Sequence, residues 1–118
     1  MNFTGLAEIF GSRAAEAVLL HLFHHGESYG RAVSGDCGIS LDSVQRQLEK
    51  FERAGILVAM RHGRTVVYSF NPRSRAASRL RDLVAVFYDG MSLESKEQLF
   101  PVRRRHRSKD KPVIYGKP

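Results

Sequence analysis

One stretch of the chain, residues 40–54, carries polar side chains suited to hydrogen bonding with another molecule. Counted at 100° per residue, one side of a helix over this range holds six polar residues: Asp42, Ser43, Arg46, Glu49, Lys50 and Arg53. This face mixes donors with acceptors. Arg46, flanked by Ser43 and Gln47, presents two parallel donors that can pair with guanine or with phosphate. We interpret the face as a reader of base edges; the alternative is a solvated helix face.

Two arginines follow a short distance along the chain. Arg61 and Arg64 stand on either side of His62-Gly63, between two runs of β-forming residues. Guanidinium groups at the tip of a hairpin can contact phosphates or enter a minor groove. They can also serve only to keep the hairpin soluble. Their position directly after residues 40–54 favours contact with nucleic acid.

The elements that must position these side chains follow from apolar spacing and turn residues. Ser40 is a natural N-cap for a helix over 40–54, whose apolar residues recur at three- and four-residue spacing and which Gly55 ends. Residues 56–60 and 65–70 are β-rich. A tight hairpin, turning at a glycine with positive φ, is the natural interpretation of these two runs.

Three helices are predicted before this unit. The first covers 4–10 with Thr4 as its cap, and the second follows Gly11-Ser12 and runs to Gly26. The third, over 29–37, is weaker because each of its two glycines costs about 1 kcal/mol relative to alanine. Gly38-Ile39-Ser40 then provides the turn of a helix-turn-helix.

The capped helix, the glycine stop and the arginine-tipped hairpin together resemble the second half of a winged helix-turn-helix. The resemblance covers about residues 9–88 and rests on the words SVQRQLEKFERAGIL and RHGRTVVYSFNP. These words are similar to those of small bacterial ArsR/MarR-type regulators, and especially to winged-helix modules encoded with or fused to nucleotidyltransferases. The resemblance implies that the helix matching 40–54 enters the major groove and that the hairpin matching 56–70 touches the flanking backbone.

This interpretation predicts a mainly α fold with a small β-hairpin, namely a winged helix-turn-helix with an extra C-terminal dimerisation helix and a basic tail. The expected partner is double-stranded DNA. The predicted DNA-binding residues come from the helix, the wing and the tail, and are Ser40, Asp42, Ser43, Gln45, Arg46, Gln47, Lys50, Arg61, His62, Arg64, Thr65, Arg103, Arg104, Arg105 and Arg107.

A long helix is predicted after the wing, over residues 72–91, with Asn71-Pro72 as its cap and first-turn proline. Its second half, residues 83–88, is apolar nearly all round, which is more than one small core requires. We therefore expect a homodimer, with residues 4–10 joining the interface. The predicted interface residues are Leu6, Phe10, Leu80, Leu83, Val84, Val86, Phe87 and Met91.

Charge is concentrated at the C-terminal end. The 118 residues carry a formal charge of +7, and residues 101–118 hold seven Lys and Arg against Asp110, so this tail contributes +6 and the rest of the chain +1. A nucleic-acid partner is thus suggested by charge mainly through the tail, although a solvated terminus is the alternative. We divide the chain into a winged-helix domain with its dimerisation helix, 1–91, and a short helix with a basic arm, 92–118.

The cellular location follows from what the sequence lacks. No apolar run approaches the roughly 20 residues that a membrane span needs, and the N-terminal residues do not form a signal peptide pattern. One cysteine cannot form an internal disulfide, which fits a reducing compartment. We therefore expect a cytoplasmic protein.

Metal binding and catalysis find little support in the sequence. Cys37 occupies an apolar position, so we expect a buried core cysteine. His21 and His25 have the i,i+4 spacing that can chelate a metal. We place them, together with His24, on the polar side of their helix, where the sequence offers no acidic or cysteine partner. We expect solvated histidines and no metal. No catalytic motif or phosphate loop is present, so we predict neither an enzyme nor a cofactor.

Two functional classes remain open. The first is a homodimeric, sequence-specific transcriptional regulator that acts as a repressor. For such a regulator, an effector that the sequence does not identify is also left open. The second is a protein-interaction or architectural module whose basic tail binds nucleic acid nonspecifically. The arginine-tipped wing favours the first class, because a protein-binding winged helix does not need cations there.

Overall fold

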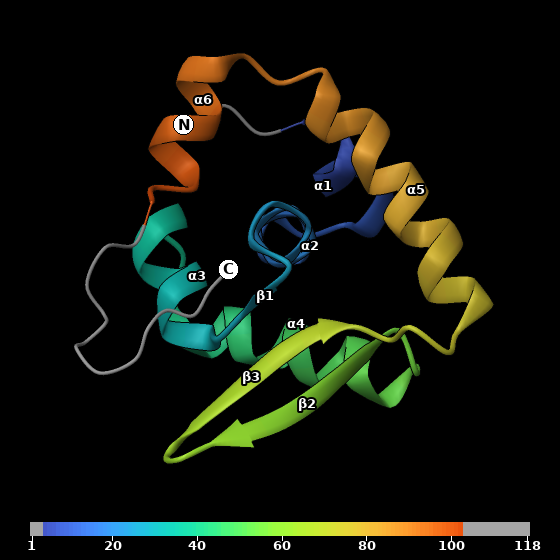
Figure 1. The fold of residues 1–118 in the computed structure, drawn as a ribbon. Helices are drawn as coiled ribbons and strands as arrows, with labels where there is room; N and C mark the ends of the chain where they lie inside the picture. Colours follow the sequence, from blue (N-terminus) through green and yellow to red (C-terminus); the bar gives the residue numbers. More distant parts are fainter. Residues whose placement is uncertain (1–3, 103–118) are drawn as a thin grey trace.

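The computed structural model describes residues 4–102 and shows a mainly helical protein with one small sheet (Figure 1). The predicted mainly helical fold with a small β-hairpin is therefore confirmed, whereas the dimerisation role of the C-terminal helix stays a prediction. The arginines of the predicted arm, residues 103–107, lie outside the described residues. The elements, in chain order, are α1 (Leu6–Phe10), α2 (Arg13–His25), β1 (Glu27–Ser28), α3 (Gly30–Cys37), α4 (Leu41–Arg53), β2 (Leu57–His62), β3 (Thr65–Phe70), α5 (Arg75–Asp89) and α6 (Leu93–Leu99).

Helix α2 is the centre of the protein. Figure 1 shows it end-on, with α1, α3, α4 and α5 arranged around it. Every residue from 14 to 22 is buried, because neighbouring elements cover all sides of the helix. Residues 14–22 therefore have no solvent-facing side, so the polar residues among them must find partners inside the protein.

This enclosure corrects the prediction for the histidines. His21 is fully buried, and its Nε2 lies 2.8 Å from Oδ2 of Asp36 on α3. His25 is half-buried, whereas His24 is exposed with Nδ1 2.7 Å from the hydroxyl of Tyr88. The prediction of solvated histidines without an acidic partner was therefore wrong for His21, because it treated α2 as an isolated helix with one solvated side. For His24, which is exposed, it is confirmed.

Helices α3 and α4 form the predicted helix-turn-helix. Gly38 ends α3 with φ 69°, and the Ser34 hydroxyl donates to the carbonyl of Ile39 at 2.6 Å, which fixes the turn. Gly30 leaves room for side chains of α4, because a Cβ at this position would lie 2.8 Å from Oε1 of Gln45. The glycine that lowers the helix propensity of α3 thus has a packing role.

The sheet is antiparallel with strand order β1-β3-β2. In the hairpin, His62 pairs with Thr65, so only Gly63 and Arg64 form the turn, with Gly63 at φ 65°. The predicted four-residue connection was too long, because Arg61 and His62 continue the β2 ladder. The sequence did not predict β1, whose two residues are too few to show an alternating pattern.

Two helices begin later than predicted. Helix α1 has Gly5, not Thr4, as its N-cap, although the Thr4 hydroxyl accepts a hydrogen bond from the Leu6 amide. Helix α5 begins after Ser74, whose hydroxyl accepts from the amide of Ala77 at 3.0 Å. Asn71 instead turns the chain: its side chain donates to the Gly55 carbonyl and accepts from the Arg73 amide.

A buried glutamate supplies the cap that α1 lacks. Oε1 and Oε2 of Glu16 accept hydrogen bonds from the amides of Ala7 and Thr4, each at 2.6 Å. Burial raises the pKa of Glu16 above 4.5, and these two amide hydrogen bonds offset part of that effect. The carboxyl group therefore fixes α1 to the start of α2.

Burial explains the state of the single cysteine. Cys37 is 1% exposed, and desolvation, followed by the neighbouring charge of Asp36, raises its thiol pKa to about 12. The prediction of a buried core cysteine is confirmed, and its thiol stays protonated and unreactive at neutral pH. Between residues 4 and 102, no helix has both the length and the apolar character required to cross a membrane.

Candidate nucleic-acid interface

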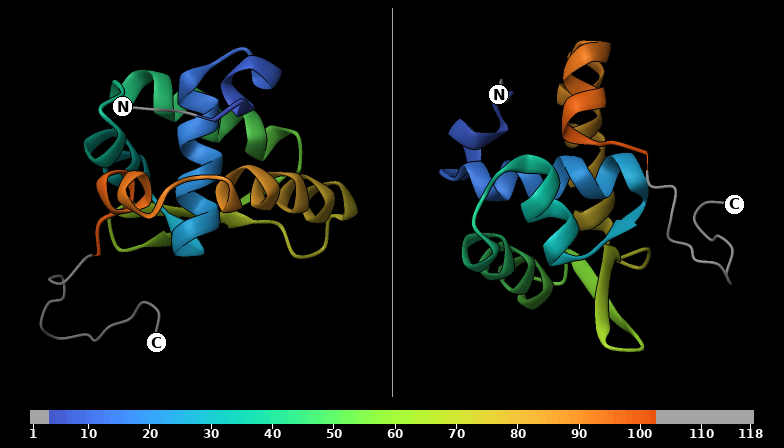
Figure 2. Two further views of the ribbon diagram at one scale, coloured as in Figure 1. Left: turned by 90° about the horizontal axis from the view of Figure 1, so that it is seen from above. Right: turned by 90° about the vertical axis from the view of Figure 1, so that its left-hand side faces the viewer.

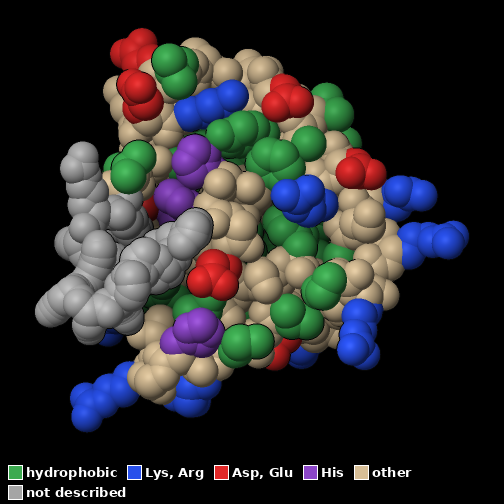
Figure 3. Space-filling view, in the orientation of Figure 1, with side chains coloured by type: hydrophobic (Ala, Val, Ile, Leu, Met, Phe, Trp, Pro, Cys, Tyr) green, Lys and Arg blue, Asp and Glu red, His purple; other side chains and the backbone are tan. Residues whose placement is uncertain are grey.

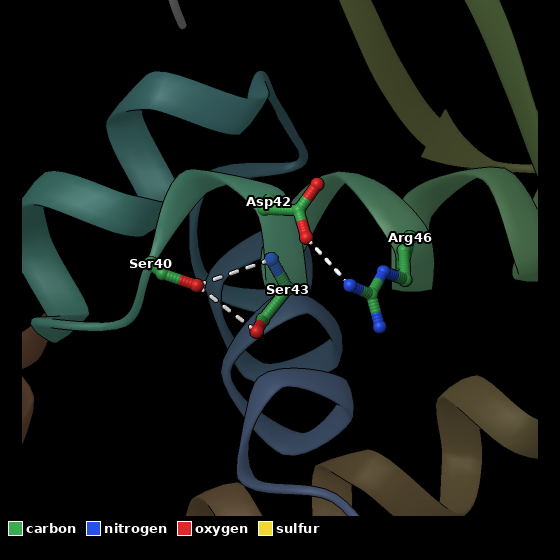
Figure 4. Close-up of polar contacts among 4 residues, drawn as sticks. All are labelled: Ser40, Asp42, Ser43 and Arg46. Atoms are coloured by element: carbon green, nitrogen blue, oxygen red, sulfur yellow. Dashed lines mark hydrogen bonds and ion pairs between the residues drawn. The ribbon is translucent and has the colours of Figure 1, made fainter.

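Helix α4 presents the predicted polar face to solvent. The Ser40 hydroxyl caps the helix by accepting from the Ser43 amide at 3.2 Å, as predicted (Figure 4). Val44, Leu48 and Phe51 are buried against the body of the protein. Because this apolar stripe is fixed inward, the opposite side of α4 points outward along the whole helix.

Arg46 and Asp42 form an ion pair on this outer side. Arg46 Nη2 lies 2.6 Å from Asp42 Oδ2, and the two side chains are 74% and 76% exposed (Figure 4). An exposed i,i+4 pair contributes about 0.3–0.5 kcal/mol. A stronger partner for the guanidinium can therefore displace Asp42 at little cost.

The exposed charges of α4 cancel. Three acids are matched by three bases, all of them exposed: Asp42, Glu49, Glu52, Arg46, Lys50 and Arg53. The helix itself therefore has no net attraction for a polyanion. Its surface is suited to discriminating between hydrogen-bonding patterns, while other parts of the protein must supply charge.

The glutamines predicted to bind DNA lie deeper than the charged residues. Gln45 is half-buried, and its Nε2 donates to the Tyr68 hydroxyl at 3.3 Å and to Glu49 at 3.2 Å, so it connects α4 to β3. Burial raises the pKa of Tyr68 and keeps its hydroxyl protonated. Gln47 is half-buried, and its Oε1 accepts no hydrogen bond from the part of the chain that the structure describes.

The wing lies beside α4 and extends from the body (Figures 1 and 2). Leu57 and Tyr68 are buried where the wing meets the body of the protein, whereas Arg61, His62 and Arg64 are exposed at its tip. The exposed α4 face and the wing tip thus belong to neighbouring elements, which is the arrangement that the sequence predicted. Thr65, also in the predicted set, is half-buried.

A hollow of about 510 Å³ borders the outer face of α4. It brings Ser12 and Arg13, at the N-terminus of α2, next to Ser43 and Arg46. The sequence prediction missed Ser12 and Arg13 as candidate site residues. The signal was a capped helix start followed by arginine, but nothing in the sequence places that start beside α4.

Further exposed cations border this region. On the face shown in Figure 3, Lys and Arg side chains lie at the wing tip and around the lower end of α5. Arg73, Arg75 and Arg79 are all exposed near the start of α5, which follows the wing directly. The sequence prediction did not include these residues, because they belong to a helix that it assigned to dimerisation.

The predicted dimer surface is smaller than the sequence suggested. Leu6 and Val84 are fully buried within the chain, and Phe10 makes an edge contact with Phe51, with ring centroids 6.1 Å apart. We remove Leu6 and Val84 from the set, because they lie entirely within the core of one chain, while Phe10 is half-buried and stays a predicted interface residue. Leu80, Phe87 and Met91 are half-buried, while Leu83 and Val86 are exposed at 38% and 67%.

Helix α1 does adjoin this surface. A Cβ on Gly5 would lie 3.0 Å from the ring of Phe87, which shows how closely the chain before α1 approaches α5. Ile9 of α1 is 56% exposed. A groove of about 410 Å³, lined by Thr4, Phe87, Met91 and their neighbours, runs beside α5.

Comparison with solved structures identifies the fold. One similar structure is the winged helix-turn-helix DNA-binding domain of Mb0332 from Mycobacterium bovis, which is described as homodimeric and as a possible ArsR-family transcriptional regulator. It is 21% identical to this chain, with a TM-score of 0.51, and the match covers 86% of this chain and 84% of that chain. The antimony-specific transcriptional repressor AntR is 20% identical, with a TM-score of 0.50 and coverage of 79% and 81%.

A third structure, reduced AbfR bound to DNA, is 16% identical, with a TM-score of 0.52 and coverage of 76% of this chain and 66% of that chain. No family model and no curated protein matches the sequence. At these identities the likeness establishes the fold: the protein is a winged helix-turn-helix, in agreement with the resemblance found in the sequence.

Proposed function

We propose that this protein is a homodimeric, sequence-specific regulator of transcription that binds double-stranded DNA and acts as a repressor. Helix α4 enters the major groove, and the wing follows the flanking backbone. The observation that carries the proposal is the exposed Asp42–Arg46 face of α4, which lies beside a wing tipped by Arg61 and Arg64. In this arrangement the helix that reads bases determines sequence specificity, and the cationic wing that contacts phosphates contributes affinity.

The hollow between α2 and α4 gives a place for one phosphate of the DNA backbone. Ser12, Arg13 and Ala14 at the start of α2 border it, and the positive end of the helix dipole together with the charge of Arg13 attracts an anion. A phosphate here fixes the depth at which Arg46 approaches the bases. The arginines of residues 103–107 are proposed to add further phosphate contacts.

The likeness to known structures supports the class of function. One similar structure is a complex with DNA, another is described as a repressor, and a third as a homodimer. The exposed apolar residues Ile9, Leu83 and Val86 give this chain a surface through which two copies can associate. Two copies related by a two-fold axis would present two α4 helices to successive major grooves.

One observation favours the alternative, a winged helix that binds another protein. The exposed charges on α4 sum to zero, and such a surface can dock on a protein without electrostatic repulsion. Selection of bound duplexes from random DNA separates the two functions. We expect enrichment of a palindrome whose half-sites lie about 10 base pairs apart. Binding without enrichment of any sequence would favour the interaction or architectural module.

A further inference from the structure

Three potential metal ligands meet where α2 contacts the C-terminal end of α3. They are His21, His25 and Asp36, and one ligand atom from each lies within 4.8 Å of the other two. The imidazole rings of His21 and His25 are side by side one turn apart on α2, with centroids 4.5 Å apart. Asp36, the acidic partner absent from the sequence prediction, approaches to 2.8 Å from His21 Nε2.

The spacing suits a small cation after a modest adjustment. Two ligands of a tetrahedral ion with bonds of about 2.1 Å lie roughly 3.4 Å apart, so the widest pair here must close by at most about 1.4 Å. His25 is half-buried and Asp36 is partly exposed, so rotation of these two side chains can provide this movement. Two imidazoles and one carboxylate are the ligands that Zn²⁺, Co²⁺ and Ni²⁺ prefer, whereas Ca²⁺ and Mg²⁺ require oxygen.

A second observation concerns the buried ring of His21 itself. His21 is fully buried, and its Nδ1 has no hydrogen-bond partner among the described residues. When Nε2 donates its hydrogen to Asp36, Nδ1 retains a lone pair inside the protein. Within residues 4–102 this ring is therefore incompletely satisfied, which is uncommon for a buried polar group.

The surroundings shield the cluster without filling it. Phe100, at the end of α6, is buried, and its ring centroid lies 5.9 Å from that of His21 and 6.4 Å from that of His25. His25 is half-buried and Asp36 is 11% exposed, so the cluster lies close enough to the surface for an ion to reach it. An apolar cover of this kind lowers the local dielectric and strengthens the attraction between a cation and a carboxylate.

We propose that His21, His25 and Asp36 bind one divalent transition-metal ion of the Zn²⁺ type, with water in the remaining position. The ion joins α2 to the last turn of α3, immediately before the Gly38 turn that leads into α4. Because the three ligands meet only in the folded protein, binding of the ion stabilises the helix-turn-helix against unfolding.

The test is titration of the untagged full-length protein with Zn²⁺, after removal of metals by a chelator. We expect one ion per chain and, at about 100 times the dissociation constant, an unfolding midpoint raised by about 10 °C. His25→Gln and Asp36→Asn should each weaken binding by at least about tenfold. The titration contains no DNA, so its result is independent of the proposed function.

His24→Gln is the matched control, because His24 is adjacent in sequence but exposed and lies against Tyr88. This variant should bind Zn²⁺ as the unmodified protein does. Circular dichroism shows whether each variant is folded, and if Asp36→Asn does not fold, the folded His25→Gln decides. The proposal is overturned if the full-length protein shows no saturable binding, if His25→Gln binds Zn²⁺ as tightly as the unmodified protein, or if His24→Gln loses binding equally.

Discussion

At the scale of single residues, the ion pair of Arg46 with Asp42 is weak enough for the guanidinium to change partners. Asp42 holds it at 2.6 Å, but both side chains are about three-quarters exposed. The pair is worth under about 1 kcal/mol, whereas a bidentate contact to guanine provides about 1–3 kcal/mol of discrimination. In the proposed complex a guanine therefore displaces Asp42 from Arg46, and in the free protein Asp42 holds the side chain in place.

Glu16 gives a pH dependence that can be checked. Burial raises its pKa in the folded protein above the ordinary value of 4.5, so the folded state binds its proton more tightly than the unfolded state does. The stability contributed by protonated Glu16 is complete below about pH 4.5 and is lost as the pH rises through the folded-state pKa. Glutamine at this position cannot titrate.

We therefore predict that the free energy of unfolding of the unmodified protein, relative to that of Glu16→Gln, decreases as the pH is raised from about 4 to 7. Urea unfolding of both proteins at several pH values in this range measures the difference. A difference that stays constant, or that increases with pH, would show that Glu16 is not desolvated in the way its burial implies.

At the scale of elements, two glycines of α3 have different environments. A Cβ on Gly35 meets nothing within 4 Å, and its φ is not positive, whereas a Cβ on Gly30 would lie 2.8 Å from Gln45 and 3.2 Å from Leu41. We predict that Gly35→Ala increases the free energy of unfolding by about 0.5–1 kcal/mol. Gly30→Ala should give no such gain, because the side chains of Gln45 and Leu41 must move away from the new methyl group.

Thermal or urea unfolding of the two single variants provides the comparison, and each serves as the control for the other. An equal gain in both would mean that Gly30 does not determine the packing of α3 against α4. A loss in Gly35→Ala would contradict the open space beside that residue.

Most elements could be predicted from the sequence, because their signals are local. The Ser40 cap, the apolar stripe of α4 and the turn at Gly63 each involve residues close together in the chain. What could not be predicted depends on contacts between distant segments. Asp36 meets His21 across 15 positions, and Glu16 caps α1 from another helix, so no periodic pattern reveals either contact.

The same reasoning explains which parts of the candidate site's geometry could be predicted. The outward face of α4 and the wing tip could be predicted because both follow from spacing within one element. Arg13 could not, because it reaches the interface only when the start of α2 packs beside α4. Val84 was assigned to the dimer surface because helical spacing shows that a side is apolar but not which neighbour covers it.

At the scale of the whole molecule, the proposed DNA surface and the proposed dimer surface lie on different elements. Val86 is 67% exposed on α5, so a charge there is tolerated by the monomer but is costly inside an interface. We predict that Val86→Glu weakens dimerisation at least about tenfold while the fold persists. Sedimentation equilibrium measures this change.

Met60→Glu is the control, because Met60 is similarly exposed, at 63%, but belongs to β2 of the wing. It should leave the self-association constant unchanged. If the unmodified protein remains a monomer at tens of micromolar, or if both variants behave alike, α5 is not the surface that joins two copies.

The measurement that tests the central claim most directly is the ratio of affinities for a selected site and for random DNA, determined at one salt concentration for the unmodified protein, Arg46→Ala and Arg64→Ala. If α4 reads bases and the wing contacts phosphates, Arg46→Ala costs about 1–3 kcal/mol on the selected site and lowers the ratio, whereas Arg64→Ala weakens both DNAs equally and preserves it. An unchanged ratio in Arg46→Ala, together with unchanged binding in Arg64→Ala, would contradict the assignment of α4 as the reader and of the wing as its backbone contact.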